Sequence, residues 1–87
     1  MATIEIYTSP FCGFCFQAKA LLDAKGVEFE EIDVFSVAGA RDEMIKRSGG
    51  NTSVPQVFAD DKYVGDCDAI HMFEDDGILD KKLGLAG

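Results

Sequence analysis

The amino-acid sequence predicts an α/β fold, with secondary-structure elements in the order β-α-β-α-β-β-α. Two observations support this prediction. Runs rich in β-branched and aromatic residues alternate along the chain with runs in which apolar residues recur at helical spacing. The first strand, helix and second strand follow one another closely, and a strand–helix–strand unit this short implies a right-handed parallel crossover. With 87 residues, the chain is expected to form a single domain, residues 1–87.

The first strand and the first helix meet at a short turn that contains two cysteines. Residues 3–8 form the predicted strand, because they carry the β-branched and aromatic side chains that suit strands. Ser9-Pro10 interrupts that strand. Residues 13–25 are predicted to be helical, and Gly26 suits the left-handed position just beyond a helix C-terminus. The apolar positions of this helix have the spacing i, i+4, i+7 and i+8: Phe14, Ala18, Leu21 and Leu22.

The middle of the chain is predicted to contain a second strand and a second helix. The strand covers residues 27–34. The helix begins at Ser36 or at the Ala38-Gly39 turn, continues through Ile45 and closes at residues 48–50. Its charged residues are expected only to keep the outer face of the helix soluble: Asp42, Glu43, Lys46 and Arg47.

A β-hairpin is predicted next. Residues 56–59 form a strand that follows Val54-Pro55, and a proline is tolerated at the start of a strand. Asp60-Asp61 is the predicted turn, and residues 62–64 form the returning strand. Because this turn lacks the usual glycine, the sequence does not define its type.

The chain is predicted to end with a third helix and a short apolar tail. The helix opens at residues 65–68, where aspartates can accept hydrogen bonds from its first N–H groups. Ile70 and Phe73 are expected to face inward, and Gly77 ends the helix. Residues 78–85 are expected to pack back as a final helical turn.

The candidate chemistry lies in the turn before the first helix, where Cys12 and Cys15 form a Cys-x-x-Cys motif. Cys12 is expected to lie where unpaired N–H groups and the positive end of the helix dipole point outward, a position that stabilises a thiolate. Cys15 comes one turn later, within reach of Cys12 on the same face. One exposed sulfur above a second, covered one is the layout of a reversible dithiol–disulfide couple. Cys12 is therefore the predicted nucleophile and Cys15 the predicted resolving thiol.

The charge balance argues against two classes of partner. The net charge is −8, and no stripe of lysine and arginine is present, which argues against nucleic acid and against an anionic membrane surface. No apolar run approaches the ~20 residues of a membrane-spanning helix. The N-terminus shows no signal-peptide pattern. We therefore expect a soluble, cytoplasmic protein, in which a Cys-x-x-Cys is more often catalytic or metal-binding than structural.

These motifs together resemble a known family. A Cys-x-x-Cys at the first strand–helix junction and a Val-Pro before the third strand resemble the thioredoxin fold, which is a four-stranded mixed sheet flanked by helices. Further segments make the whole chain similar to the short bacterial dithiol glutaredoxins: Ile-Tyr-Thr before the motif, Ala-Lys-Ala-Leu-Leu after it, Met-Ile-Lys-Arg-Ser-Gly, Val-Pro-Gln-Val-Phe and Gly-Asp-Cys-Asp. The resemblance implies a glutaredoxin-type thiol–disulfide oxidoreductase that serves electron transport and cell redox homeostasis. It also implies a cis peptide bond at Val54-Pro55.

The resemblance further implies a glutathione site beside the dithiol. In glutaredoxins the glutathione moiety pairs with the backbone before the proline, here Val54, and its γ-glutamyl end lies at the third helix, here at Cys67 and Asp68. A carboxylate at a helix N-terminus is favourable by itself. Glutathione is then the reductant, the partners are disulfide-bearing or glutathionylated proteins, and the enzyme is a monomer. The residues implied to bind glutathione are Phe14, Ser53, Val54, Pro55, Gly65, Cys67 and Asp68.

Five positions depart from the usual glutaredoxin pattern. Gly13 stands where a proline is common, and Phe14 where a tyrosine is common. Ser9 replaces a lysine near the nucleophile, and Ala69 stands where an aspartate commonly pairs with the γ-glutamyl ammonium. Asp66 replaces the second glycine of a Gly-Gly pair. Because two charge-assisted contacts are lost, we expect weaker glutathione binding than in relatives that keep both.

Two other functions fit parts of the sequence. Gly13 favours a cluster carrier, in which Cys12 from two subunits and two glutathiones hold a [2Fe–2S] cluster in a bridged dimer, because related proteins with proline there generally do not assemble it. Cys12, Cys15, Cys67 and His71 form a Cys₃His set that could instead bind zinc. No other metal site is expected. Outside these roles, Cys67 is predicted to be chemically quiet and His71 to face solvent or cap its helix.

Three phenylalanines surround the predicted nucleophile. Phe14 is expected to lie partly in the helix core, whereas Phe11 and Phe16 are expected to face solvent. An apolar rim of this kind is more often a contact surface than an accident, although scattered surface residues are the alternative.

Overall fold

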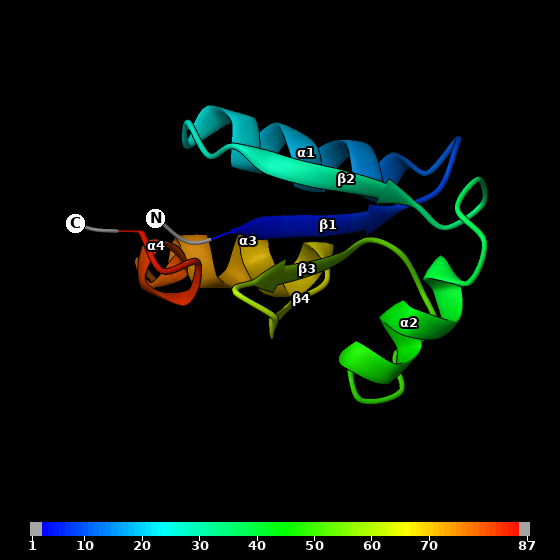
Figure 1. The fold of residues 1–87 in the computed structure, drawn as a ribbon. Coiled ribbons are helices and arrows are strands. Elements are labelled where there is room, and N and C mark those ends of the chain that lie inside the picture. The colour runs from blue at the N-terminus through cyan, green and yellow to red at the C-terminus, as the bar shows by residue number, and fades with distance from the viewer. Residues whose placement is uncertain (1–2, 86–87) are drawn as a thin grey trace.

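The protein, described here by a computed structural model covering residues 3–85, is a four-stranded sheet with helices on both faces (Figure 1). The strand order is β2-β1-β3-β4, with β1 parallel to β2 and antiparallel to β3. This confirms the predicted α/β class, the parallel crossover and the mixed sheet. The elements are β1 (Ile4–Thr8), α1 (Gly13–Ala24), β2 (Phe29–Asp33), α2 (Ala40–Arg47), β3 (Gln56–Ala59), β4 (Lys62–Gly65), α3 (Cys67–Asp75) and α4 (Leu79–Lys82).

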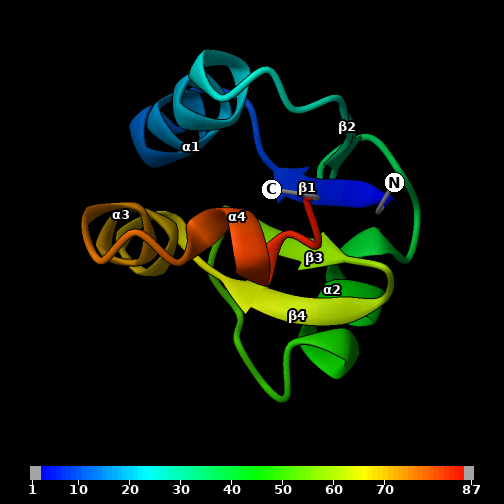
Figure 2. The same ribbon diagram turned by 90° about the vertical axis from the view of Figure 1, so that its left-hand side faces the viewer.

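The helices divide between the two faces of the sheet. Helices α1, α3 and α4 cover one face, and α2 covers the other (Figures 1 and 2). The central strand β1 serves both faces by the alternation of its side chains: Ile4 and Ile6 pack under α1 and α3, whereas Tyr7 packs under α2. The turn that carries Cys12 therefore follows directly from a strand that is covered on both faces.

The larger core lies under α1, α3 and α4. Its fully buried side chains include Leu22 from α1, Ile70 from α3, and Leu79 and Leu83 at either end of α4. Each such side chain contributes about 1.5–3 kcal/mol when it leaves water. The predicted tail therefore does pack back as a short helix, although Ile78 stays largely exposed.

The smaller core, under α2, contains an ionic contact that corrects a sequence prediction. Arg47 was expected only to solvate the helix, but its guanidinium lies 4.2 Å from the centre of the Phe58 ring and 2.8 Å from a Glu5 carboxylate oxygen. It also donates to the Tyr7 hydroxyl at 2.7 Å, and that hydroxyl donates to Glu43 at 2.7 Å. The hydrogen bonds to Glu5 and Tyr7 raise the pKa of Arg47. Arg47 and Glu43 thus anchor α2 to the sheet.

Turn geometry decides two points that the sequence left open. Gly39 has a φ of 79° and precedes α2, so the helix starts at the Ala38-Gly39 turn and not at Ser36. Asp60 and Asp61 have φ values of 50° and 67°, the pair of left-handed residues that a type I′ hairpin requires. The second strand is shorter than predicted, because it begins at Phe29. Within residues 3–85, no helix combines the length and apolar character needed to cross a membrane.

Candidate active site

Cys12 is the N-cap residue of α1. Its backbone is extended, and its sulfur accepts a hydrogen bond from the Cys15 N–H at 3.2 Å. The residue before it, Phe11, has a φ of 61°, which is costly for a bulky side chain. Strained backbone of this kind concentrates at functional sites, and here it turns the chain so that the first free N–H groups of α1 meet a sulfur.

The two sulfurs of the motif have different environments. Cys12 is half-buried, whereas Cys15 is only 2 % exposed under the first turn of α1. Burial, and then a hydrogen bond with Cys12, raise the pKa of Cys15 to about 12, against smaller opposing effects of the Ser9 backbone and Lys19. Cys15 is therefore a neutral thiol at physiological pH. The arrangement matches the predicted pair of one accessible and one covered sulfur.

The Val54-Pro55 peptide bond is cis, as the resemblance implied. The Val54 carbonyl oxygen lies 3.9 Å from the Cys12 sulfur. A hollow of about 220 Å³ opens between this segment and the start of α3. Its lining residues come from α1, from the segment before β3 and from the start of α3: Phe14, Ser53, Val54, Pro55, Asp66, Cys67 and Asp68.

The hollow unites six of the seven residues expected to bind glutathione, and Gly65 does not line it. Gly65 has a φ of 154°, and a Cβ atom there would lie 2.5 Å from the Cβ of Ala69. Only glycine permits this close approach of β4 to α3, so the role of Gly65 is to position the hollow. Asp66 lines the hollow without having been assigned to it. The feature of the sequence that could have indicated this role is that Asp66 replaces the second glycine of the Gly-Gly pair usual in the family.

The start of α3 is capped by its own carboxylate. Asp66 accepts a hydrogen bond from the Ala69 N–H at 2.9 Å, which confirms that an aspartate caps this helix. Asp68 lies exposed in the first turn. The Cys67 sulfur is buried, and burial followed by the nearby charges of Asp68 and Asp66 raises the pKa of its thiol. The Cys67 thiol is thus buried, and its chemical quietness stays a prediction.

His71 is half-buried and does not simply face solvent. Its Nδ1 lies 2.8 Å from the Cys67 carbonyl oxygen and 3.6 Å from the Cys67 sulfur. Across residues 3–85, no three or more histidine, cysteine, aspartate or glutamate side chains are arranged to hold a metal ion. The Cys₃His set suggested by the sequence is thus not assembled in this part of the chain.

Phe14 corrects another prediction. It is 60 % exposed and lines the hollow instead of entering the core. Cys15 and Ala18 occupy the inward positions of the first turns of α1, and Phe14 lines the hollow together with Pro55 and Asp66. Phe11 and Phe16 face solvent as predicted.

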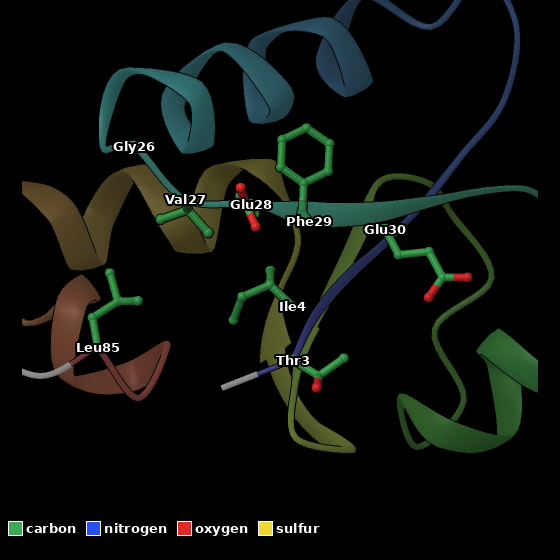
Figure 3. A pocket seen from close by; sticks show the side chains of 8 residues that line it. All are labelled: Thr3, Ile4, Gly26, Val27, Glu28, Phe29, Glu30 and Leu85. Carbon is green, nitrogen blue, oxygen red and sulfur yellow. The ribbon is translucent and has the colours of Figure 1, made fainter. Parts of the chain in front are cut away.

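A separate hollow lies at the opposite end of the sheet, where β1 and β2 begin (Figure 3). It measures about 540 Å³ and is lined mainly by apolar side chains, with Glu28 and Glu30 at its edge. It contains no thiol, imidazole or ammonium group. The chemistry of the molecule is therefore concentrated at the end where β1 gives way to α1.

A two-cysteine turn capping α1 on a thioredoxin-type sheet, with a buried second thiol, defines a thiol–disulfide oxidoreductase. Comparison with known proteins agrees. The glutaredoxin family model matches residues 4–64. The chain is 48 % identical over 83 residues to glutaredoxin 3 of Escherichia coli K12, covering 95 % of this chain and 99 % of that one. It is 50 % identical over 82 residues to glutaredoxin 1 of Rickettsia typhi, covering 93 % and 79 %.

The solved structures to which this chain is similar are also glutaredoxins. The solution structure of a Brucella melitensis glutaredoxin superposes with a TM-score of 0.81 at 46 % identity, covering 100 % of this chain and 96 % of that one. A buckwheat glutaredoxin solved with glutathione has a TM-score of 0.85 at 24 % identity, covering 98 % and 83 %, and shows the shared fold. The chain belongs to the glutaredoxin family. It is a glutaredoxin-type thiol–disulfide oxidoreductase.

Proposed function

We propose that this enzyme reduces disulfides and glutathione mixed disulfides with glutathione as reductant, using Cys12 as nucleophile and Cys15 as resolving thiol. The observation that carries the proposal is the contrast between the two sulfurs. Cys12 is partly exposed, and its sulfur accepts an N–H hydrogen bond at the N-terminus of α1. Cys15 is buried, and its pKa is raised to about 12.

In the first step, the Cys12 thiolate attacks one sulfur of the substrate disulfide. A bond forms between Cys12 and that sulfur while the substrate S–S bond breaks, and the leaving thiolate takes a proton from water. When the attacked sulfur belongs to glutathione, the product is a Cys12–glutathione mixed disulfide. When it belongs to a protein, the substrate polypeptide is itself bound to Cys12.

Two thiols can resolve this intermediate. A glutathione thiolate that attacks the glutathione sulfur on Cys12 yields oxidised glutathione and regenerates the Cys12 thiolate. Alternatively, Cys15 loses its proton and attacks Cys12, which forms the Cys12–Cys15 disulfide and releases the substrate thiol. Two glutathione molecules then reduce that disulfide to the dithiol and leave as oxidised glutathione. A hydrogen bond between the Cys12 and Cys15 side chains is one cause of the raised pKa of Cys15. This side-chain bond is lost when the Cys12 sulfur bonds to the substrate.

The hollow beside Cys12 supplies the groups that suit glutathione. Val54 offers backbone partners next to the Cys12 sulfur, and the first N–H groups of α3, at Cys67 and Asp68, can receive the γ-glutamyl carboxylate. The exposed Asp68 carboxylate is the candidate partner for the γ-glutamyl ammonium, because Asp66 already accepts the Ala69 N–H. The proposal places the enzyme where glutathione is kept reduced, as in the cytoplasm.

The test is a glutathione-coupled disulfide reductase assay on the wild type and on Cys12→Ser. The mixed disulfide of glutathione with 2-mercaptoethanol is a suitable substrate, because it offers no polypeptide to bind. We expect turnover by the wild type and none by Cys12→Ser. Equal activity of the two proteins, or no dependence on glutathione, would contradict the proposal.

One observation favours the cluster carrier as a second candidate. A Cβ atom at Gly13 would meet nothing within 4 Å, so the space in front of the α1 N-terminus is open. The residue of this chain that would hold a cluster there is Cys12, one from each subunit of a bridged dimer, and two glutathione thiolates would supply the other two ligands. Anaerobic purification tests this candidate, since a bound cluster colours the protein brown, and a colourless monomer with reductase activity would leave the first proposal alone.

A further inference from the structure

A second hollow adjoins Cys12 and shares no lining residue with the first. It measures about 690 Å³ and lies where the ends of β1 and β2 meet the start of α1. The loops after these two strands are tied together at the same end of the molecule, because the Val34 N–H donates to the Thr8 carbonyl at 2.9 Å (Figure 1). The lining residues are Thr8, Ser9, Pro10, Phe11, Cys12, Gly13, Cys15, Phe16, Lys19, Glu31 and Asp33.

Exposed aromatic rings gather at this end of the molecule. The exposed fractions are 106 % for Phe11, 71 % for Phe16 and 81 % for Phe35. Phe35 is held by the turn after β2, where its N–H donates to an Asp33 carboxylate oxygen at 2.8 Å. Three exposed rings, one in the turn before α1, one on α1 and one in the loop after β2, have the composition of a contact surface. We call Phe11, Phe16 and Phe35 the aromatic rim.

The charges around Cys12 are mostly negative. The second hollow has the carboxylates of Glu31 and Asp33 and one ammonium, that of Lys19, which lies 2.9 Å from Glu31. Asp33 therefore remains without a basic neighbour among the lining residues. The first hollow adds Asp66 and Asp68 and no basic side chain. Both approaches to the Cys12 sulfur thus carry excess negative charge, in a chain of net charge −8.

We propose that the aromatic rim is the docking surface for the polypeptide of a disulfide substrate, and that it selects cysteines flanked by an apolar residue and by lysine or arginine. The proposal rests on the proposed function, in which Cys12 bonds covalently to a substrate sulfur. An S–S bond of about 2.05 Å brings the residues beside that cysteine against Phe11 and Phe16. A flanking cation is then attracted by Asp33 and by the exposed ring faces.

The first experiment compares two cyclic peptide disulfides that differ only beside one cysteine, with Leu-Lys in one and Leu-Glu in the other. Reduction by the wild type is followed with glutathione and glutathione reductase. We expect a kcat/KM about tenfold higher for the lysine peptide at low salt, and a smaller ratio in high salt, where exposed charges are screened. Equal values for the two peptides at low salt would overturn the charge preference.

Two variants with matched controls locate the surface. Phe16→Ser should lower the ratio of lysine-peptide activity to activity on the glutathione–mercaptoethanol disulfide about fivefold. Met72→Ser removes an exposed apolar side chain of α3 that lines neither hollow, and should leave that ratio unchanged. Asp33→Asn should lower the lysine-to-glutamate preference about threefold, whereas Asp75→Asn, at the end of α3, should not change it. Unchanged ratios in Phe16→Ser and Asp33→Asn would overturn the proposal.

A final arm separates this proposal from the proposed function. If the wild type fails to turn over the small mixed disulfide, the glutathione mechanism is wrong. Covalent capture of the two peptides by Cys15→Ser, measured by mass spectrometry without glutathione, still ranks them. Faster capture of the lysine peptide supports the docking surface in that case, and equal capture refutes it.

Discussion

Helices α1 and α3 begin beside the same hollow, but their N-termini are capped differently. The cap of α1 is the Cys12 sulfur, 3.2 Å from the Cys15 N–H, and no acidic residue lies in its first turn. The cap of α3 is the Asp66 carboxylate, 2.9 Å from the Ala69 N–H, and Asp68 follows in its first turn. One helix directs its positive end at a nucleophile, and the other neutralises its positive end with its own side chains.

This difference separates reactivity from stability. A carboxylate cap contributes about 1 kcal/mol to the stability of the helix that it caps. The sulfur cap of α1 instead places the atom that can act as a nucleophile at the start of the helix. Cys67, at the first position of α3, is buried and has a raised thiol pKa, in part because the charges of Asp68 and Asp66 lie close by. Burial, and then its acidic neighbours, thus raise the pKa of the Cys67 thiol, whereas the sulfur of Cys12 is partly exposed at the N-terminus of α1.

Replacing the α1 cap should have the largest effect. Cys12→Ser keeps a side chain that can cap the helix, but it removes the only accessible sulfur of the dithiol. We expect loss of all reductase activity with little change in the free energy of unfolding. Activity assays and urea denaturation of the same preparation separate the two quantities. Residual activity above a tenth of the wild type would show that Cys67 or Cys15 can substitute.

Cys15→Ser should affect one class of substrate. Reduction of the glutathione–mercaptoethanol disulfide should stay largely intact, because glutathione can resolve its mixed disulfide. Reduction of a protein disulfide should fall by about tenfold or more, since the intramolecular exit is lost. Equal losses on both substrates would contradict this division of roles between the thiols.

Alkaline pH tests the burial of Cys15. Its pKa is about 12 in the folded protein and 9.0 ordinarily, so the folded state favours the neutral thiol. The resulting stability is fully present below pH 9.0 and is lost as the pH rises through about 12. In reducing buffer we expect the contribution of Cys15 to lower the free energy of unfolding by roughly 2 kcal/mol at about pH 10.5.

Tyr7 also lowers the stability of the fold at alkaline pH, because burial raises the pKa of its phenol. Comparison with Cys15→Ser therefore isolates the thiol. The variant should lose less stability between neutral and alkaline pH than the wild type in urea denaturation. If both proteins lose the same amount, Cys15 is not the group responsible.

The cap of α3 should have the smallest effect. Asp66→Ala is expected to lower the free energy of unfolding by about 1 kcal/mol, because the Ala69 N–H loses its acceptor. Asp66→Asn keeps an acceptor oxygen at that position and should cost only a few tenths of a kcal/mol. Thermal or urea denaturation of both variants measures the difference. Equal destabilisation would mean that charge, and not capping, is what Asp66 supplies.

Local patterns in the sequence predicted the element order and the two-cysteine turn, and the family resemblance implied six of the seven residues that line the hollow beside Cys12. Pro10 and Gly26 mark where strand and helix end, and residues 12–15 bring two sulfurs onto one turn by spacing alone. Local patterns did not reveal the contacts of single side chains with segments far apart in the chain. By sequence, Arg47 was expected only to solvate the outer face of α2, but its guanidinium packs over the Phe58 ring. Phe14 has the spacing of a core residue, but it lines the same hollow as Pro55. Periodicity indicates which face of a helix is apolar, and it does not show what lies opposite the first turn.

The most direct test of the account is a brief alkylation of the reduced protein with limiting iodoacetamide at neutral pH, mapped by fragment mass spectrometry. Labelling reports which cysteine has a sulfur that is both accessible and reactive. Cys12 at the start of α1 should take nearly all the label, and the buried Cys15 and Cys67 should take little. Equal labelling of Cys67, or preferential labelling of Cys15, would contradict the claim that Cys12 is the nucleophile.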